Sequence, residues 1–401
     1  MRTYTLLKKF FLCLLMVSFF VSTVAAIDWY QYQGPNRDLI SPETDWRVNW
    51  AENEPKISWK KSIGFGFASM TIDNGRVYAM GNIDDTDYVW CFDEKTGEEL
   101  WRHTYACERH NKQHEGGPCG TPSVDGESVY TISKMGQMFC LDAKTGKVKW
   151  QKELTKEFGA KIPTWYFAGS VLLEEDDLII DVGLIIRMDK QGNVKWKTQD
   201  YGSAYSTPVG FDLYGNRYIA AFPEYGLVIL DAKTGKEFGK YEWETRYGVN
   251  AATPLILENK AFVSSGYNEG GALLEINKQG EIKQLWHNRL MRNHMNTCVL
   301  WEGHIYGFDE STLKCISVKT GEDVWKSRGH GKGSLMLAGG HLIVLSERGE
   351  LLIAKATSEG FNPISRKQVL TGKCWTVPAL SNGRIYARNA EGDLICLDVR
   401  K

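Results

Sequence analysis

The stretch CLDAKTGKVKW, from Cys140 to Trp150, decides the fold of this chain because it recurs. The same pattern appears upstream as CFDEKTGEELW (Cys91–Trp101) and downstream as ISVKTGEDVW (Ile316–Trp325). Aspartate and threonine can bond backbone groups of such a turn, and glycine adopts the left-handed conformation that the turn needs. The pattern predicts two strands joined by a tight turn, with a tryptophan on the second strand that packs against a neighbouring unit.

A second series of short strands, aromatic or β-branched at the centre, marks the repeating unit. The central residues, at intervals of 37 to 52 residues, are Tyr78, Tyr130, Ile179, Tyr218, Phe262, Tyr306, Ile343 and Tyr386. Each unit reads as four short strands, and such periods are typical of a β-propeller. Strands broken by Gly, Asn and Asp argue against paired helices. The predicted fold is all-β, an eight-bladed propeller of four-stranded antiparallel blades.

The two ends of the chain complete one unit between them. The last unit stops at CLDVRK (396–401), before its outer strand, and the missing strand appears near the start as KISWKKS around Trp59. A ring closed in this way leaves no open edge strand. The sequence therefore predicts one domain, residues 27–401, with the ring closed by the N-terminal strand.

The first 26 residues differ from the rest in composition. Three basic residues precede the apolar run Phe10–Val21, and small residues follow at Val24–Ala26. This order predicts a signal peptide over residues 1–26, with an apolar core too short for a membrane span. Cys13 follows a leucine instead of the small residue that a lipoprotein signal requires, so no lipid anchor is predicted. No second apolar run reaches membrane length, and the predicted location is periplasmic or secreted.

Charge and cysteine content narrow the class of partner. Without residues 1–26 the chain has 45 basic and 49 acidic residues, which argues against a nucleic-acid partner.

Four of the remaining eight cysteines, among them Cys91 and Cys140, share one position in the repeat and are predicted to be buried and free. Cys107 and Cys119 bracket a polar, glycine-rich loop, where an oxidising compartment favours a disulfide between them. Two free thiols are the alternative. We expect a monomer.

The repeats resemble the pyrroloquinoline-quinone (PQQ) type propeller repeat, whose signature is A-x-D-x-x-T-G-x-x-x-W. Cys91 and Cys140 replace the alanine, and the match covers essentially the whole chain after residue 26. This superfamily includes quinoprotein alcohol dehydrogenases and the propeller lipoprotein of the outer-membrane barrel-assembly machine. The opening DWYQYQGPNRD (28–38) is similar to that of secreted members. The resemblance implies the fold and leaves the chemistry open, because one fold hosts many functions.

In a propeller, the residues before each inner strand surround one mouth of the central channel. On this basis the predicted ligand-binding residues are Trp165, Tyr205, Arg246, Asn250, Arg292, His294, Lys332 and Trp375. Aromatic faces stack on sugar rings, and arginine grips carboxylates. We therefore expect an anionic sugar that stacks on Trp375 while its carboxylate binds Arg292. The alternative is an ordinary solvated face.

Function is predicted to be that of a binding or scaffold module for a glycan, a peptide or a protein at the channel face. The alternatives are a quinoprotein-type alcohol or sugar oxidoreductase and a propeller polysaccharide lyase or hydrolase. The quinoprotein pattern includes adjacent cysteines and often C-x-x-C-H, which this chain lacks, so no PQQ is expected. His110 and His114 are four residues apart in a polar loop, where a metal site is not expected. No catalytic residue is assigned.

Overall fold

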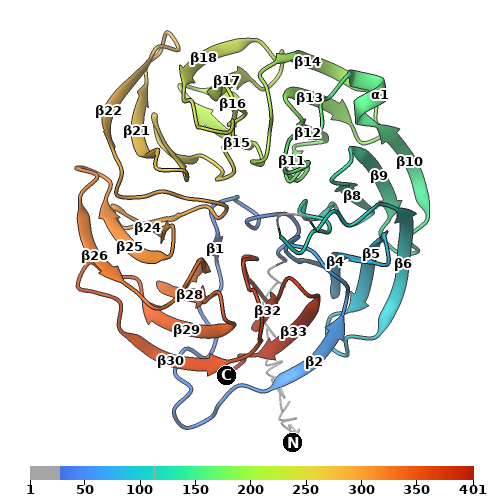
Figure 1. Cartoon of the computed structure of the whole chain (residues 1–401), viewed down its shortest axis with the longest axis vertical. Helices are drawn as coiled ribbons and strands as arrows, with labels where there is room; N and C mark the ends of the chain where they lie inside the picture. The colour runs from blue at the N-terminus through green and yellow to red at the C-terminus, as the bar shows by residue number, and fades with distance from the viewer. Residues whose placement is uncertain (1–27, 112–113) are drawn as a thin grey trace, which may run out of the picture.

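The computed structural model describes residues 28–111 and 114–401, so the predicted signal peptide lies outside the described residues. Eight sheets surround a common centre (Figure 1), and each contains a blade of four antiparallel strands. Within the described residues, one short helix, α1 (Leu154–Phe158), follows the second sheet. In the first seven blades the four strands follow the order of the chain. The predicted eight-bladed propeller is confirmed.

The strands of the first four blades follow one another in the sequence. They are β3 (Thr71–Asp73), β4 (Arg76–Ile83), β5 (Thr86–Asp93) and β6 (Glu99–Ala106); β7 (Ser123–Val124), β8 (Ser128–Ile132), β9 (Gln137–Asp142) and β10 (Val148–Glu153); β11 (Leu172–Glu174), β12 (Asp177–Asp181), β13 (Leu184–Asp189) and β14 (Val194–Asp200); β15 (Val209–Leu213), β16 (Asn216–Ala221), β17 (Gly226–Asp231) and β18 (Glu237–Glu242).

The remaining blades repeat this order until the chain ends. They are β19 (Leu255–Leu257), β20 (Lys260–Ser265), β21 (Gly270–Ile276) and β22 (Ile282–Asn288); β23 (Val299–Trp301), β24 (His304–Asp309), β25 (Thr312–Ser317) and β26 (Asp323–Ser327); β27 (Ser334–Ala338), β28 (His341–Leu345), β29 (Glu350–Lys355) and β30 (Pro363–Gln368); β31 (Ala379–Ser381), β32 (Arg384–Arg388) and β33 (Asp393–Asp398).

The eighth blade takes its outer strand from the beginning of the chain. Strand β2 (Ile57–Ser62) pairs antiparallel with β33, with Trp59 opposite Cys396. The predicted closure by the N-terminal strand is confirmed. The seventh blade gains a fifth strand that the repeat does not predict, because β1 (Ile40–Ser41) pairs parallel with the inner strand β27.

The recurring motif forms the joint between blades as well as the turn within a blade. Asp142 Oδ1 accepts hydrogen bonds from the backbone N–H (2.8 Å) and the hydroxyl (2.7 Å) of Thr145. The indole N–H of Trp101, on the preceding blade, donates to the carbonyl just after that aspartate, at Ala143. The same bond joins other pairs of neighbours: Trp59 to Glu94, Trp150 to Lys190, Trp196 to Ala232, and Trp286 to Val318. The motif is repeated because most turns receive the tryptophan of the blade before them. The fourth and seventh blades differ, with Gly239 and Ser365 at the tryptophan position.

The N-terminal segment, residues 29–43, crosses the centre of the ring (Figure 1). It begins on the first two blades, where backbone carbonyls of Trp29 and Tyr30 accept from the N–H groups of Ile72 and Val124. Further along, the buried guanidinium of Arg37 donates to the backbone carbonyls of Val171 and Pro208, next to the third and fourth inner strands.

The same segment then reaches the other four blades. Gln33 Nε2 donates to the hydroxyls of Thr253 (3.0 Å) and Thr297 (2.9 Å), at the fifth and sixth inner strands. The backbone carbonyl of Leu39 accepts from the N–H of Leu337, in the inner strand of the seventh blade. The Glu43 carboxylate accepts from the backbone N–H of Gly383, in the eighth blade. The segment therefore bonds to every blade and closes the central channel across its width.

Candidate functional site: the channel pocket

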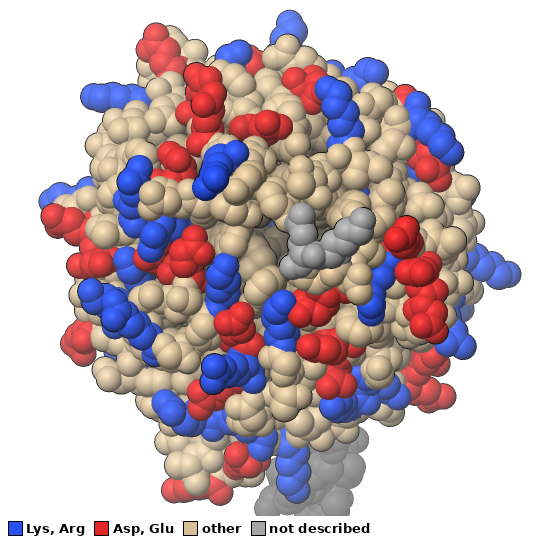
Figure 2. Space-filling view, in the orientation of Figure 1, with Lys and Arg blue, Asp and Glu red and all other residues tan. Residues whose placement is uncertain are grey.

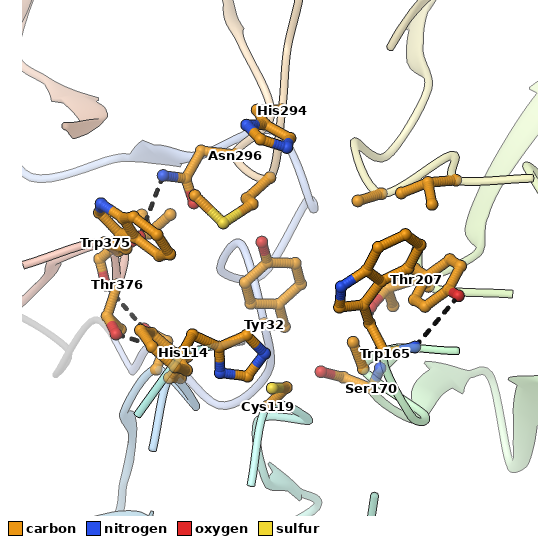
Figure 3. Close-up of a pocket in the computed structure, with 18 of the residues that line it drawn as sticks. Tyr32, His114, Cys119, Trp165, Ser170, Thr207, His294, Asn296, Trp375 and Thr376 are labelled. Carbon is orange, nitrogen blue, oxygen red and sulfur yellow. Dashed lines mark hydrogen bonds between the residues drawn. The ribbon is translucent and has the colours of Figure 1, made fainter. Parts of the chain in front are cut away.

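A pocket of about 300 Å³ occupies the channel above the N-terminal segment. Tyr32 of that segment lies at its centre, between walls supplied by the blades (Figure 3). The wall residues His114, Trp165, Tyr205, His294 and Trp375 all precede inner strands, as the propeller topology predicts. Figure 2 shows one face of the ring with a hollow near its centre and mixed charges around it.

Two aromatic walls face each other across this pocket (Figure 3). On one side Trp375 stacks on Phe67, with ring centroids 5.7 Å apart at 26°. On the other side the ring centroid of Trp165 lies 6.3 Å from the ring centroids of both Tyr205 and Tyr267. Aromatic faces on opposite walls suit a flat ring between them.

Hydroxyl groups connect the inner strands around the channel. The backbone N–H of Ser69 donates to Thr121 Oγ1, that of Thr121 to Ser170 Oγ, and that of Ser170 to Thr207 Oγ1, each at 2.9 Å. In the same way, the backbone N–H of Thr253 donates to Thr297 Oγ1 at 2.8 Å. Each hydroxyl oxygen thereby accepts from the preceding blade. The hydroxyl hydrogens of Ser170 and Thr207, which line the pocket, have no acceptor among residues 28–111 and 114–401.

The two pocket histidines both make their contacts through Nδ1. His114 Nδ1 accepts from the backbone N–H of Gly116 at 3.1 Å, and burial lowers the pKa of His114. His294 Nδ1 lies 2.6 Å from Lys332 Nζ, a group that can only donate. The His114 ring therefore carries its proton on Nε2.

A small charged cluster stands beside His294. Glu310 Oε2 lies 3.4 Å from His294 Nδ1 and 3.6 Å from Lys332 Nζ. Hydrogen bonding to His294, together with the nearby positive charges, lowers the pKa of Glu310. The cluster lies mainly in an adjoining small cavity, whose lining includes Phe308, Glu310 and Lys332.

The pocket lining itself carries no lysine, arginine, aspartate or glutamate among the described residues. Charged groups just outside it are paired. Lys373 binds Glu115 at 2.7 Å, and Glu347 accepts from the indole N–H of Trp375 at 2.8 Å. The described lining of the pocket is therefore largely aromatic, and the charged side chains next to it are engaged with other groups.

The predicted site residues separate into two groups. Trp165, Tyr205, His294 and Trp375 line the pocket, and Lys332 lies in the adjoining cavity. The other three predicted residues, Arg246, Asn250 and Arg292, do not line either cavity.

Their own contacts explain this. Arg292 grips Asp309 with two bonds, Nε–Oδ1 at 2.6 Å and Nη2–Oδ2 at 3.1 Å. Asn250 is fully buried and bonds to Pro223 and Ser265, so its role is structural. Arg246 is exposed, with its guanidinium 5.2 Å from the Tyr247 ring. Asp309 therefore holds the Arg292 guanidinium outside the pocket lining, and the expected contact of Arg292 with a ligand carboxylate beside Trp375 stays a prediction.

Sequence reasoning missed three kinds of pocket residue. Tyr32 belongs to the N-terminal segment, and Phe67 precedes the first inner strand, a position that the sequence analysis left out. The third kind is the set of hydroxyl side chains, which the sequence does indicate. A serine or threonine stands at or just before most inner strands, as in GTPSV (120–124). Read as a ring, these positions indicate a polar belt around the channel.

The predicted Cys107–Cys119 disulfide is also corrected, since both residues are free thiols in the structure. Cys119 lines the pocket, whereas Cys107 is buried at the end of β6, where its carbonyl accepts from Asn82. His114, from the segment between them, lines the pocket, and the buried Lys134 donates to the Arg109 carbonyl. Burial raises the pKa of Cys107 to about 12 and that of Cys119 to about 11.

Two further findings concern metals and membranes. Across residues 28–111 and 114–401, no group of three or more His, Cys, Asp or Glu side chains is placed to hold a metal ion. His110 and His114 bond to separate backbone groups, those of Glu108 and Gly116. Within the same described ranges, no helix has the length and apolar character needed to cross a membrane.

Comparison with known proteins places this architecture. BamB of Yersinia pestis, an outer membrane protein assembly factor, is 21% identical over 302 residues, which cover 68% of this chain and 72% of that protein. The crystal structure of BamB from Moraxella catarrhalis superposes with a TM-score of 0.62 at 16% identity, covering 86% of this chain and 99% of the other. Quinohemoprotein alcohol dehydrogenase from Comamonas testosteroni gives a TM-score of 0.64 at 13% identity, covering 93% of this chain and 80% of the other.

At these identities the likeness to solved structures shows the fold alone. The sequence itself carries the assignment. A family profile described as outer membrane protein assembly factor BamB matches residues 85–327, more than half of the chain. The chain therefore belongs to the PQQ-repeat propeller family that bears this description.

Proposed function

We propose that this protein is a non-catalytic scaffold that holds a protein or peptide partner at the channel face, in the assembly of outer-membrane proteins. The family assignment supports the process, because the matching profile and the Yersinia pestis relative are both described as assembly factors. The location that goes with this role is the periplasm, and the predicted signal peptide agrees with it.

The observation that carries the binding role is an aromatic cluster at the rim of the pocket. Tyr247 is 48% exposed and lies 5.8 Å from Trp165 and 5.1 Å from Tyr267, both in edge-to-face contact. The guanidinium of Arg246 covers the Tyr247 ring. Exposed tryptophan, tyrosine and arginine side chains are the residues that most often anchor protein partners. We call Trp165, Arg246, Tyr247 and Tyr267 the rim cluster.

The experiment replaces the rim cluster in cells that lack the endogenous gene. Tyr247→Ala and Arg246→Ala should each reduce the folded fraction of outer-membrane β-barrel proteins, measured by heat-modifiable mobility in gels. The matched control is Tyr214→Ala, because Tyr214 is also exposed, at 40%, and lies in the turn between β15 and β16. Normal assembly in the gene deletion itself, or equal effects of Tyr247→Ala and Tyr214→Ala, would contradict the proposal.

The quinoprotein alternative meets a chemical difficulty. PQQ is a quinone that carries several carboxylates, and such a ligand needs guanidinium or ammonium partners in a buried site. The pocket lining offers aromatic, hydroxyl, imidazole and amide groups instead. The described residues therefore do not fit PQQ, and we propose that the protein binds none.

A lyase or hydrolase is a second candidate, and one observation favours it. His294 forms part of the pocket wall while Lys332 and Glu310 contact its Nδ1, an arrangement that can support proton transfer at Nε2. His294→Gln should then abolish any polysaccharide-cleaving activity. Absence of cleavage by the unaltered protein on a polysaccharide panel would remove this candidate.

A further inference from the structure

We infer that the channel pocket binds a small, neutral saccharide of one or two rings, a ligand separate from the protein partner of the rim cluster. The pocket is closed below by the N-terminal segment, through Tyr32, and its volume of about 300 Å³ is at the lower end for ligand pockets. A closed pocket of this size excludes a long polysaccharide chain or a peptide threaded through the ring.

The walls fit the faces of a sugar ring. Trp375 stands across the pocket from Trp165 (Figure 3). Phe67 packs against Trp375, and Tyr205 lies beside Trp165. The C–H faces of a pyranose pack on aromatic rings of this kind, and a second wall encloses the opposite face.

Charge decides between a neutral and an anionic sugar. The described lining contains no cationic side chain, and the nearest cations, Lys332 and Lys373, already contact Glu310 and Glu115. A carboxylate buried here would lose its water without gaining a counter-ion, which is strongly unfavourable. A neutral ligand carries no such penalty.

Hydrogen-bonding groups decide between a sugar and a purely apolar ring. The Trp165 indole N–H points into the pocket (Figure 3) and has no acceptor within the described part of the chain. Burial raises the pKa of Tyr32 and raises that of Tyr205 to about 12, so both hydroxyls stay protonated. Ser170 and Thr207 contribute two further O–H donors.

The pocket also offers an acceptor. Asn296 Nδ2 donates to the backbone carbonyls of Gly333 (3.1 Å) and Trp375 (3.0 Å), which leaves the amide oxygen of Asn296 for the ligand. An apolar occupant would bury all of these groups without partners. A ligand rich in hydroxyls, which both donate and accept, satisfies them.

The test measures binding to the purified protein by calorimetry and saturation-transfer NMR. The neutral probes are N-acetylglucosamine, methyl α-glucopyranoside and cellobiose, the anionic probe is glucuronic acid, and the apolar probe is indole. At least one neutral saccharide should bind with a Kd of about 1 mM or lower, and glucuronic acid at least about tenfold more weakly. Binding of none of the neutral probes, tighter binding of glucuronic acid, or binding of indole alone would overturn the inference.

Conservative variants locate the site. Tyr32→Phe and Trp165→Phe remove one donor each while keeping a ring, and each should weaken saccharide binding at least about threefold. The matched control is Tyr30→Phe, because Tyr30 lies in the same segment and its hydroxyl faces the Pro35 carbonyl outside the pocket. Equal affinity in all three variants would place the sugar elsewhere and overturn the inference. Tyr32 lines the pocket and lies outside the rim cluster. Tyr32→Phe therefore tests the sugar site alone, so failure here is distinct from failure of the scaffold proposal.

Discussion

The ring of Trp101 lies directly over Gly146 of the following blade. A β-carbon at Gly146 would stand 2.5 Å from Trp101 Cε3, and the backbone there has φ of +71°. This glycine therefore serves two purposes, since it permits the turn and makes room for the tryptophan of its neighbour. The blade joint depends on both.

Gly146→Ala should lower the free energy of unfolding by about 3 kcal/mol, because strain in the backbone adds to overpacking against the indole. The matched control is Gly75→Ala, where φ is +72° and no heavy atom lies within 4 Å of the added carbon. The control should lower the free energy of unfolding by only about 1 kcal/mol, which is the contribution of backbone strain alone. Urea denaturation of both variants measures the difference, and equal losses would contradict the packing role.

Removal of residues 1–63 should cause aggregation, because it exposes the edge of β33 and removes the N-terminal segment from the channel. Removal of residues 1–27 is the control and should leave a soluble protein. Light scattering and size-exclusion chromatography compare the two. A soluble truncated protein that keeps the parent Tm would refute closure by β2.

Asp181 should make stability fall as the pH rises. The side chain is 3% exposed, Oδ2 has no partner, and burial raises its pKa from 3.8 to about 7. Because the folded state holds the proton more tightly, the stabilisation is complete below about pH 4 and is lost as the pH rises towards and through 7.

Asp181→Asn removes this ionisation while keeping an acceptor for the Gly183 N–H. It should raise the free energy of unfolding at pH 8 by more than about 1 kcal/mol and change it little at pH 4. The same gain at both pH values would show that the carboxyl does not titrate in this range.

Cys107 and Cys119 should react slowly with iodoacetamide at pH 8, because burial raises both pKa values well above that pH. Cys119 should react first, since it faces the pocket. Mass-spectrometric mapping of protein purified without reductant gives the order. Recovery of a Cys107–Cys119 disulfide peptide would restore the sequence-based prediction.

PQQ should not bind, with or without calcium, since the pocket lining has no cationic partner for its carboxylates among the described residues. Absorbance titration with PQQ and Ca²⁺ is the measurement, with dye-linked alcohol oxidation as the second readout. Stoichiometric uptake with alcohol-dependent dye reduction would establish the oxidoreductase alternative instead.

The fold was predictable because the same turn motif occurs many times along the chain. Copies of the turn motif, such as Asp93 with Thr96 and Asp231 with Thr234, form the same hydrogen bonds. The N-terminal segment was not predictable, because it has no periodicity and its partners are remote. Gln33 bonds to a threonine 220 residues away, and its own backbone has φ of +68°.

The sequence predicts which positions lie around the channel mouth, but it does not predict which of their side chains face the pocket. Topology alone places both Arg292 and His294 at the channel mouth. Only the neighbouring strand β24 supplies Asp309, which holds Arg292 away from the pocket, while His294 stays on its wall. Pairing of this kind depends on side chains from a loop and a neighbouring strand, and local sequence does not encode it.

One contact of the N-terminal segment depends on the end of the chain. Gly383, whose N–H binds Glu43, is made 340 residues later, so this contact cannot form until the eighth blade exists. A chain cut short before its eighth blade would leave the Glu43 carboxylate without this partner and the ring open. Cellular proteases act on such incompletely folded chains.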